Sequence, residues 1–261
     1  MDHSAVEQYL SRIGVPRPVA CDADALRGLH AAHLYTVPFE NLSIHLGEPI
    51  TLDEEQLLRK LVERRRGGFC YELNGAFSDL LRSLGFEVVL LAARVFNREG
   101  ILGPPFDHLV LRVSTPEPWF VDVGFGEHSL EPLRLAPDVK QTDPRGVFEI
   151  VETSGSDLDV LKDNEPQYRV EMHPRDLSDF NAMCWYQQHS PESHFTQSLV
   201  CSIATPTGRV TLTERTLITT IGSDRTETVL RDDTEILETY RTQFGVHLDQ
   251  VPSLRPGPKG M

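Results

Sequence analysis

The sequence predicts an α+β protein in which helices and strands occupy separate parts of the chain. Apolar residues recur every three or four positions through the first third of the 261 residues, and strand-like patterns rich in Val and Leu begin at Phe86. Helices followed by strands and then by a mixed segment are typical of the α+β class. We predict three domains with mainly helical, mainly strand and mixed content, at residues 1–85, 86–190 and 191–261.

Four helices are expected in the first domain. The third begins at residues 51–54, where Thr-Leu-Asp-Glu has the pattern of a capping box with Thr51 as the cap, and it continues to about Arg65. The fourth holds Cys70 in its first turn and ends at Gly85, a residue type that commonly terminates helices. The first two cover residues 5–13 and 24–36.

Strand patterns fill the second domain. The polar, turn-rich segment 154–166 predicts an exposed loop. A hairpin is expected where two strands flank the proline-containing turn at 114–118. The expected strands of this domain are 87–94, 108–113, 119–123, 147–152 and 168–172.

The last part of the chain mixes both kinds of element. A helix is expected from Asp176 to about Gln188, and the Pro- and Gly-rich tail at 255–260 is expected to fray. The remaining expected elements are strands near 198–204, 209–213 and 216–220 and a helix near 233–244.

Cys70 is the most conspicuous candidate for a reactive group. In the first turn of a helix, unpaired backbone N–H groups and the helix dipole stabilise an anion and so lower a thiol pKa. Gly67 and Gly68 precede it and allow a sharp turn that leaves the sulfur unshielded. The position predicts a nucleophile, although a free cysteine is also common as a small buried apolar residue, and the segment alone fits both roles.

A His–Asp pair in the expected hairpin supplies a base and a group that orients the base. If Arg112 pairs with Pro118, His108 lies directly opposite Asp122; a two-residue shift of the turn makes them diagonal neighbours. Both registers leave the two side chains on one face, within hydrogen-bond reach. Without a thiol nearby the pair would be an ion pair at a strand edge, and local geometry does not show that Cys70 reaches this face.

A metal site is a third interpretation of Cys70, His108 and Asp122. Zinc sites normally have a fourth protein ligand or closely spaced ligands, and the sequence contains neither C-x-x-C nor H-x-x-x-H. We therefore expect no bound metal.

Three motifs in the first half of the chain resemble those of the arylamine N-acetyltransferases. Residues 66–75, Arg-Gly-Gly-Phe-Cys-Tyr-Glu-Leu-Asn-Gly, resemble the nucleophile motif of that family. Residues 38–42, Pro-Phe-Glu-Asn-Leu, resemble its N-terminal signature, and residues 121–126, Val-Asp-Val-Gly-Phe-Gly, its aspartate segment. The order Cys, His, Asp agrees, and residues 193–196 and 207–212 are similar to the family's C-terminal half, so the resemblance covers nearly the whole chain.

The resemblance implies a helical domain, an antiparallel β-barrel and a C-terminal α/β lid, with a Cys-His-Asp core like that of cysteine proteases where the first two domains join. It implies that acetyl-CoA acylates Cys70, that His108 is the base and that Asp122 orients it. An arylamine, hydrazine or arylhydroxylamine then takes the acetyl group, which completes a ping-pong cycle. Phe39 and Phe125 match positions that line the family's acceptor pocket, where a flat aromatic amine would fit, although buried Phe is also ordinary core packing.

Three rival functions share these residues. A biosynthetic amide synthase of the same superfamily would charge Cys70 from a carrier protein instead of CoA. A cysteine hydrolase of papain or transglutaminase type would use water or a lysine as the acceptor. A non-catalytic relative would bind aromatic ligands in a pre-formed pocket, but it would have no need of all three triad elements at consistent positions.

Composition indicates which partners to expect. The formal net charge of −14 would repel nucleic acid and anionic membranes. CoA is also anionic, but a local set of backbone N–H groups and a few basic side chains can hold one nucleotide, and Arg94, Arg98 and Arg209 are candidates. The expected partners are CoA and a small aromatic amine or hydrazine, without nucleic acid or membrane, and the oligomeric state stays open.

A cytoplasmic location is expected. The four cysteines are widely spaced and follow no disulfide framework. The first residues lack the basic-then-apolar pattern of a secretory signal, and no stretch approaches the roughly 18 consecutive apolar residues of a membrane helix.

Two acidic residues adjoin the candidate triad. Asp107 directly precedes His108, where a carboxylate facing the base would raise its pKa, but alternation along the strand predicts that Asp107 points outward. Glu127 follows the aspartate segment, and we expect its negative charge to disfavour acidic acceptors.

Overall fold

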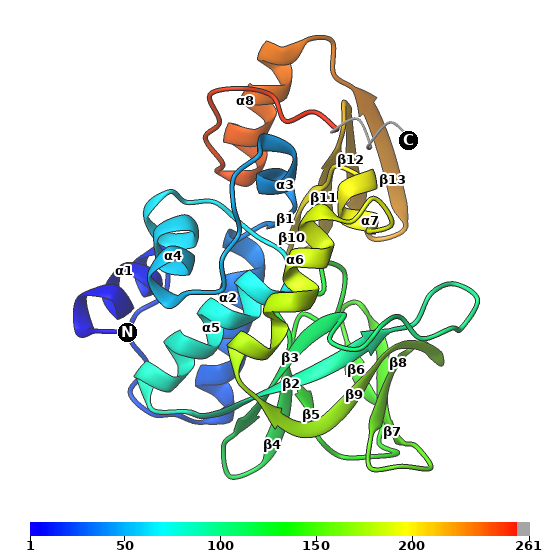
Figure 1. The fold of residues 1–261 in the computed structure, drawn as a ribbon. Coiled ribbons are helices and arrows are strands. Elements are labelled where there is room, and N and C mark those ends of the chain that lie inside the picture. Colours follow the sequence, from blue (N-terminus) through cyan, green and yellow to red (C-terminus); the bar gives the residue numbers. More distant parts are fainter. Residues whose placement is uncertain (255–261) are drawn as a thin grey trace.

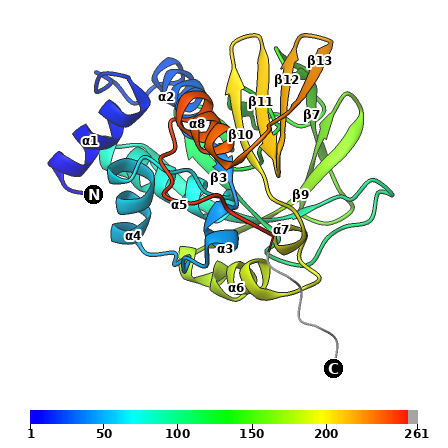
Figure 2. The same cartoon turned by 90° about the horizontal axis from the view of Figure 1, so that it is seen from above.

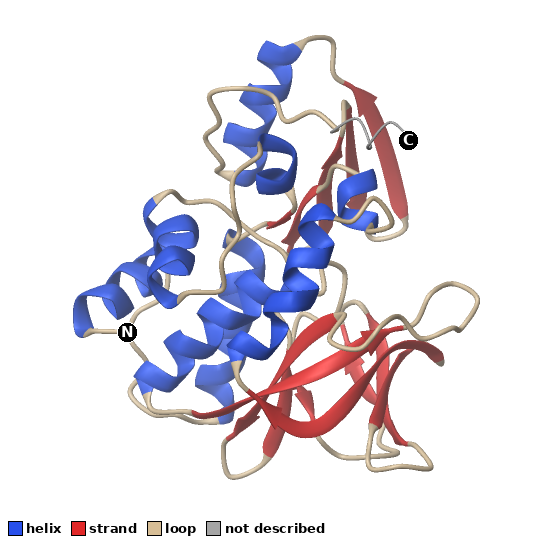
Figure 3. Ribbon diagram, in the orientation of Figure 1, coloured by secondary structure: helices blue, strands red, loops and turns tan. Residues whose placement is uncertain are grey.

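The chain up to Leu84 folds mainly into helices, which lie on one side of the computed structural model (Figures 1 and 3). The structure describes residues 1–254, and the fraying expected at 255–260 lies outside them. The helices are α1 (His3–Ile13), α2 (Ala23–Thr36), α3 (Leu42–Leu46), α4 (Glu54–Leu58) with the π-helical turn η1 (Arg59–Glu63), and α5 (Cys70–Leu84), and the short strand β1 (Phe39–Glu40) precedes α3.

The four predicted helices are confirmed, with one correction at the start of the third. Asp53, not Thr51, caps α4, because its side chain accepts hydrogen bonds from the backbone N–H groups of Glu55 at 3.1 Å and Gln56 at 3.2 Å. Asp followed three residues later by Gln has the same capping pattern as Thr followed by Glu, so the sequence alone does not separate the two positions.

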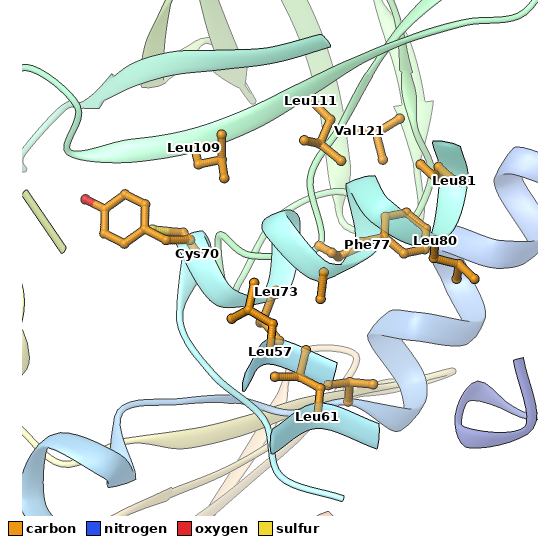
Figure 4. Packing of buried hydrophobic residues seen from close by; sticks show 14 of the residues in the cluster. Leu57, Leu61, Cys70, Leu73, Phe77, Leu80, Leu81, Leu109, Leu111 and Val121 are labelled. Atoms are coloured by element: carbon orange, nitrogen blue, oxygen red, sulfur yellow. The ribbon is translucent and has the colours of Figure 1, made fainter. Parts of the chain in front are cut away.

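Helix α5 is the central element of the core. Its buried face carries Leu73, Phe77 and Leu80 between the α4–η1 segment on one side and the sheet strands on the other (Figure 4). The residues packed around it include Leu57 and Leu61 from the helices and Leu109, Leu111 and Val121 from the strands. This packing places the first turn of α5, which holds Cys70, against the sheet.

Eight strands form one curved, barrel-like sheet in which every pairing is antiparallel (Figures 1 and 3). Their order is β5-β4-β3-β2-β9-β8-β7-β6. The inner face buries a second core that includes Leu91, Val110, Phe120, Phe148 and Tyr168. The strands are β2 (Glu87–Val95), β3 (His108–Ser114), β4 (Pro118–Val121), β5 (Leu133–Arg134), β6 (Gln141–Asp143), β7 (Gly146–Glu152), β8 (Leu158–Lys162) and β9 (Glu165–Arg175).

Strand β8 contradicts the predicted loop at 154–166. Leu158 and Val160 are buried, and the strand pairs with both β7 and β9. The apolar alternation is short and is surrounded by polar and turn-forming residues, which is why the segment resembled a loop.

The β3–β4 hairpin has the second of the two registers considered above, in which the turn is shifted by two residues. Arg112 pairs with Phe120, and Ser114 pairs with Pro118, so the pairing of Arg112 with Pro118 was wrong by two residues. Strand β3 continues one residue further than expected, and the turn is correspondingly tight, with Thr115 N–H donating to the Glu117 carbonyl at 2.9 Å. His108 and Asp122 are therefore diagonal rather than directly opposed.

The C-terminal part forms a separate five-stranded sheet with α8 packed beside it (Figure 2). Its order is β1-β10-β11-β12-β13, so the early segment Phe39–Glu40 is its edge strand next to β10. The sequence missed α7 and β13, and the three-domain boundaries stay a prediction. The elements are the 3₁₀ turn η2 (Leu177–Phe180), α6 (Asn181–His189), α7 (His194–Gln197), β10 (Cys201–Thr205), β11 (Gly208–Thr213), β12 (Thr216–Ile221), β13 (Asp224–Val229) and α8 (Asp233–Phe244).

Within residues 1–254, no helix combines the length and the apolar character needed to cross a membrane.

Candidate active site

Cys70 is the first residue of α5, as the sequence predicted. Glu72 closes the start of the helix, because the backbone N–H of Phe69 donates to its Oε2 at 3.2 Å. Lys60 Nζ donates to the other oxygen of the same carboxylate at 2.6 Å. The thiol is thus mounted on a helix end that is fixed by a buried ion pair.

The glycines before Cys70 serve close packing rather than the sharp turn expected from the sequence. A Cβ on Gly67 would lie 1.9 Å from the carbonyl oxygen of Pro38, and a Cβ on Gly68 would lie 2.7 Å from Oε2 of Glu72. Neither glycine has a positive φ. The backbone of Gly68 instead lies alongside β1, accepting a hydrogen bond from Glu40 N–H at 2.9 Å, which brings Phe39 to the nucleophile.

A buried ion pair holds this backbone contact. Arg66 is 1% exposed and its guanidinium lies 2.9 Å from Oε1 of Glu40, which is fully buried. Arg66 also contacts Glu48 Oε2 at 3.0 Å and donates to Ser43 Oγ at 3.4 Å. Burial alone would raise the pKa of Glu40, but Arg66, Lys60 and the Leu42 N–H together more than offset it and hold that pKa below its usual value. This pair was not predicted from the sequence.

Burial raises the pKa of the Cys70 thiol well above its ordinary value. The thiol is only 3% exposed, and Asp107 and Asp122 add to the rise, while the backbone amide of Leu109 acts against it. The position in the first turn of α5 therefore does not by itself produce a free thiolate, contrary to the expectation from the sequence. Deprotonation needs a base, and the structure provides one in the same cavity.

His108 donates from Nε2 to Oδ2 of Asp122 at 2.7 Å, and both side chains are buried. The predicted His–Asp contact is thus present. Burial alone would raise the pKa of Asp122, but His108, with further contributions from His128 and Asn74, more than offsets this and lowers it to about 2. The ionised carboxylate therefore fixes the Nε2–H tautomer of His108 and leaves Nδ1 as the basic ring nitrogen.

Asn74 connects the thiol helix to the His–Asp pair. Its Nδ2 donates to Oδ1 of Asp122 at 2.9 Å and to the Leu109 carbonyl at 2.6 Å, and its Oδ1 accepts from Val123 N–H at 2.9 Å. At Gly124 a Cβ would lie 2.7 Å from the Cα of Cys70, so the strand end and the helix are in direct contact. Sequence reasoning missed Asn74, although a polar residue one turn after Cys70 on a buried face was the available signal.

A cavity of about 340 Å³ contains Cys70 and His108 in its wall, together with Phe39 and Phe125. The His108 ring lies 5.2 Å from the Phe125 ring, centroid to centroid, in an edge-on arrangement. Segments from all three parts of the chain meet here. The complete lining is Phe39, Cys70, Val95, Pro104, Asp107, His108, Gly124, Phe125, Tyr186, Gln187, Glu192, Ser193, His194 and Phe195.

Of the two acidic residues considered from the sequence, Asp107 lies differently from what was expected. Asp107 is part of the cavity wall and accepts a hydrogen bond from Gln187 Nε2 at 3.1 Å, so the prediction that it points outward was wrong. The strand begins only at His108, so the alternation rule does not reach back to Asp107. Glu127 is exposed and is not among the lining residues.

Four larger hollows, of about 610, 560, 540 and 430 Å³, lie elsewhere on the described part of the chain. We favour the smaller cavity as the site, because none of these four is lined by Cys70, His108 or Asp122. In the described part of the chain, no group of three or more His, Cys, Asp and Glu side chains is arranged to hold a metal ion.

The low pKa of Asp122 predicts a specific acid sensitivity. A group whose folded-state pKa is depressed stabilises the fold above its unfolded value, about 3.9, and this stabilisation of about 2 kcal/mol is lost as the pH falls through about 2. Asp122→Asn lacks this titration, so the difference in unfolding free energy between native protein and variant is expected to shrink over that pH range. Urea unfolding from pH 6 to pH 2 measures it, and a difference that does not depend on pH would contradict the assignment. Asp224→Asn, at an exposed position on β13, is the matched control.

Comparison with known proteins gives a consistent result. Residues 22–252 match a protein-family model described as N-acetyltransferase. The chain is 38% identical over 216 residues to the arylamine N-acetyltransferase of Escherichia coli K12, covering 80% of this chain and 76% of that protein. It superposes on the solved structure of the arylamine N-acetyltransferase from Salmonella typhimurium with a TM-score of 0.88 and 31% identity, covering 98% and 96% of the two chains.

A structure of the Mycobacterium marinum arylamine N-acetyltransferase in complex with CoA is also similar. Its TM-score is 0.83 at 32% identity, and the match covers 92% of each chain. These neighbours confirm the α+β fold that the sequence pattern predicted, with the barrel and C-terminal lobe that the family resemblance implied.

Proposed function

The chain belongs to the arylamine N-acetyltransferase family, and from this premise we propose that Cys70, His108 and Asp122 carry acetyl transfer from acetyl-CoA to an arylamine. The protein is an acyltransferase that uses acetyl-CoA as its donor. The relatives and solved structures reported above are arylamine N-acetyltransferases, so neither a carrier-dependent amide synthase nor a non-catalytic binder is favoured.

The first half-reaction charges the cysteine. His108 Nδ1 takes the proton from Cys70 Sγ, and the thiolate attacks the acetyl carbonyl carbon. The C–S bond to CoA breaks, and the CoA sulfur leaves with the proton held by His108. Asp122 stabilises the imidazolium that forms between these steps, which suits a carboxylate whose pKa is lowered to about 2.

The second half-reaction discharges the acetyl-cysteine. The amine nitrogen attacks the thioester carbonyl, the C–S bond to Cys70 breaks, and the amine proton passes through His108 to the cysteine sulfur. The same base therefore serves both halves. We extend the acceptor class to hydrazines and arylhydroxylamines, because they present the same nucleophilic nitrogen or a neighbouring oxygen.

Phe39 and Phe125 are proposed to hold the acceptor ring. Both lie in the wall of the cavity that contains Cys70, and Phe39 also contacts Phe195 with ring centroids 6.1 Å apart. Aromatic faces suit a flat ring. None of the described residues that line the cavity is Lys or Arg, which supports a mode of binding in which the neutral thioester arm of CoA enters the cavity and the phosphates remain outside.

The observation that carries this proposal is the shared cavity of Cys70 and His108, with His108 bonded to a buried, ionised Asp122. Initial-rate kinetics tests it. With acetyl-CoA and a substituted aniline varied together, double-reciprocal plots are expected to be parallel, because CoA leaves before the amine reacts. Intersecting lines would indicate direct transfer within a ternary complex and would contradict the acyl-cysteine route.

A further inference from the structure

We propose that Asp107 selects the acceptor, favouring arylamines whose ring carries a cationic or hydrogen-bond-donating substituent and disfavouring those that carry a carboxylate. This inference rests on the proposed function, since it concerns the amine that discharges the acetyl-cysteine. It assigns to Asp107 a role in specificity and none in the bond-making steps.

The Asp107 carboxylate is held firmly in the cavity wall. Gln187 Nε2 donates to its Oδ1 at 3.1 Å, and Ser193 Oγ donates to Oε1 of the same glutamine at 2.5 Å. A Cβ on Gly103 would lie 2.3 Å from Oδ2, so the neighbouring backbone packs directly against the carboxylate. The hydroxyl of Tyr71, next to the nucleophile, donates to the Asp107 backbone carbonyl at 3.1 Å. Contacts from α5, from α6 and from the segment just before α7 therefore hold Asp107 in place.

The described wall of the cavity contains carboxylates but no Lys or Arg side chain. The carboxylates are those of Asp107 and Glu192. Asp107 is partly buried in the wall, whereas Glu192 is exposed. Arg94 lies nearby but is not part of the cavity wall, and its Nε donates to the Gly103 carbonyl at 2.8 Å.

The groups around Asp107 indicate how a charged substituent on the substrate would interact with its carboxylate. Burial raises the pKa of Asp107, and His108 and Arg94 act in the opposite direction without cancelling the rise. A cationic group on the substrate would lower this raised pKa, because it would stabilise the ionised carboxylate. An anionic group would meet a carboxylate already short of solvent, with no Lys or Arg in the described lining to offset the repulsion.

The expected effect of the Asp107 charge on acceptor selectivity is large enough to measure. Two unit charges about 6 Å apart at an effective dielectric constant of about 20 interact strongly enough to change a rate ratio by one to two orders of magnitude. Water in an open cavity reduces this interaction. We therefore expect a change of about tenfold in selectivity when the charge of Asp107 is removed.

The test compares three arylamines of similar size: para-aminobenzylamine, para-aminobenzyl alcohol and para-aminophenylacetate. The protein is first acetylated with acetyl-CoA and freed of CoA, and discharge of the acetyl group by each amine is followed in a single turnover at the aromatic amino group. This isolates the acceptor step from CoA binding. The ratio of cationic to anionic rates is then compared between native protein and Asp107→Asn, so that intrinsic differences in amine reactivity cancel.

In Asp107→Asn the cation-to-anion ratio is expected to fall about tenfold, because asparagine keeps the size of the side chain and an acceptor for Gln187 but loses the charge. Glu192→Gln is expected to lower the ratio less, because its side chain is exposed. Asp224→Asn, at an exposed acid on β13 outside the cavity wall, is the matched control and should leave the ratio unchanged.

An unchanged ratio in Asp107→Asn would overturn the inference while leaving the proposed function intact, because the acetylated protein would still discharge to the amines. If Asp107→Asn does not fold, Asp107→Ser, which also removes the charge, decides in its place: a lowered ratio supports the inference and an unchanged one overturns it. Failure of the proposed function would be recognised separately, since the native protein would then carry no acetyl group to discharge.

Discussion

Cys70→Ser is expected to reduce kcat/KM for arylamine acetylation by about 10⁵-fold, the scale seen when the nucleophile of a covalent catalyst is removed. The hydroxyl is close in size to the thiol, so the 3% exposed site should remain packed. Its oxygen is far less acidic than a thiol, and His108 cannot generate a useful fraction of alkoxide from it. Steady-state rates with one aniline and acetyl-CoA measure the loss.

Cys184→Ser is the matched control for this prediction. Cys184 is also buried, on α6, where it accepts a hydrogen bond from Gln188 Nε2 at 3.3 Å, and it does not line the cavity of Cys70. The rates of this variant should remain at the native level. Substantial activity in Cys70→Ser, or an equal loss in both variants, would show that Cys70 has no special part in the chemistry.

Arg66→Met is expected to lower the free energy of unfolding by about 3–5 kcal/mol, because removing one partner of a buried ion pair leaves the other charge uncompensated. Glu40 is fully buried and would retain only the hydrogen bond from Leu42 N–H at 2.7 Å. The contact between β1 and the Gly67–Gly68 backbone would weaken with it, so activity should fall as well. Chemical denaturation at neutral pH measures the stability change.

The effect of Arg66→Met should depend on pH in a defined direction. In the native protein the folded-state pKa of Glu40 is lowered, so the pair stabilises the fold above the unfolded pKa of about 4.3 and this contribution is lost as the pH falls. In the variant, burial without Arg66 raises that pKa, and protonation relieves the cost at low pH. The difference in unfolding free energy between the native protein and Arg66→Met should therefore become smaller below about pH 4.

Two further variants distinguish the loss of the buried ion pair from a loss of packing around residue 66. Adding Glu40→Gln to Arg66→Met removes the stranded charge and should recover part of the stability. Arg241→Met removes an exposed ion pair with Glu238 on α8 and should leave the unfolding free energy within error. If the loss of unfolding free energy in Arg66→Met does not depend on pH and the double variant recovers none of it, the loss comes from a cavity and not from the unpaired charge of Glu40.

Local pattern was sufficient to predict the elements that position the triad. The periodicity ending at Gly85 placed Cys70 in the first turn of α5, and the even spacing of His108 and Asp122 placed both on one face in either register. The register itself depends on how tightly the turn at 115–117 closes, which the sequence does not reveal. The missed strand β8 depends on two buried residues, Leu158 and Val160, whose burial is set by neighbouring strands.

Contacts between distant segments could not be predicted from periodicity. The bonds of Asn74 to the Asp122 segment and of Arg66 to Glu40 join residues far apart in the chain, and each is defined only once the helices and the sheet have packed. The pKa of Cys70 was predicted in the wrong direction for the same reason. Helix position is a local property, whereas the burial that dominates this pKa comes from tertiary packing.

The central claim is that Cys70 carries the acetyl group between donor and acceptor. Intact-protein mass spectrometry after incubation with acetyl-CoA and no amine tests it most directly, with Cys70→Ser measured beside the native protein. The account predicts a mass gain of one acetyl group on the native protein only, lost again when an arylamine is added. No gain on native protein whose Cys70 can still be alkylated, or an equal gain on the variant, would contradict it.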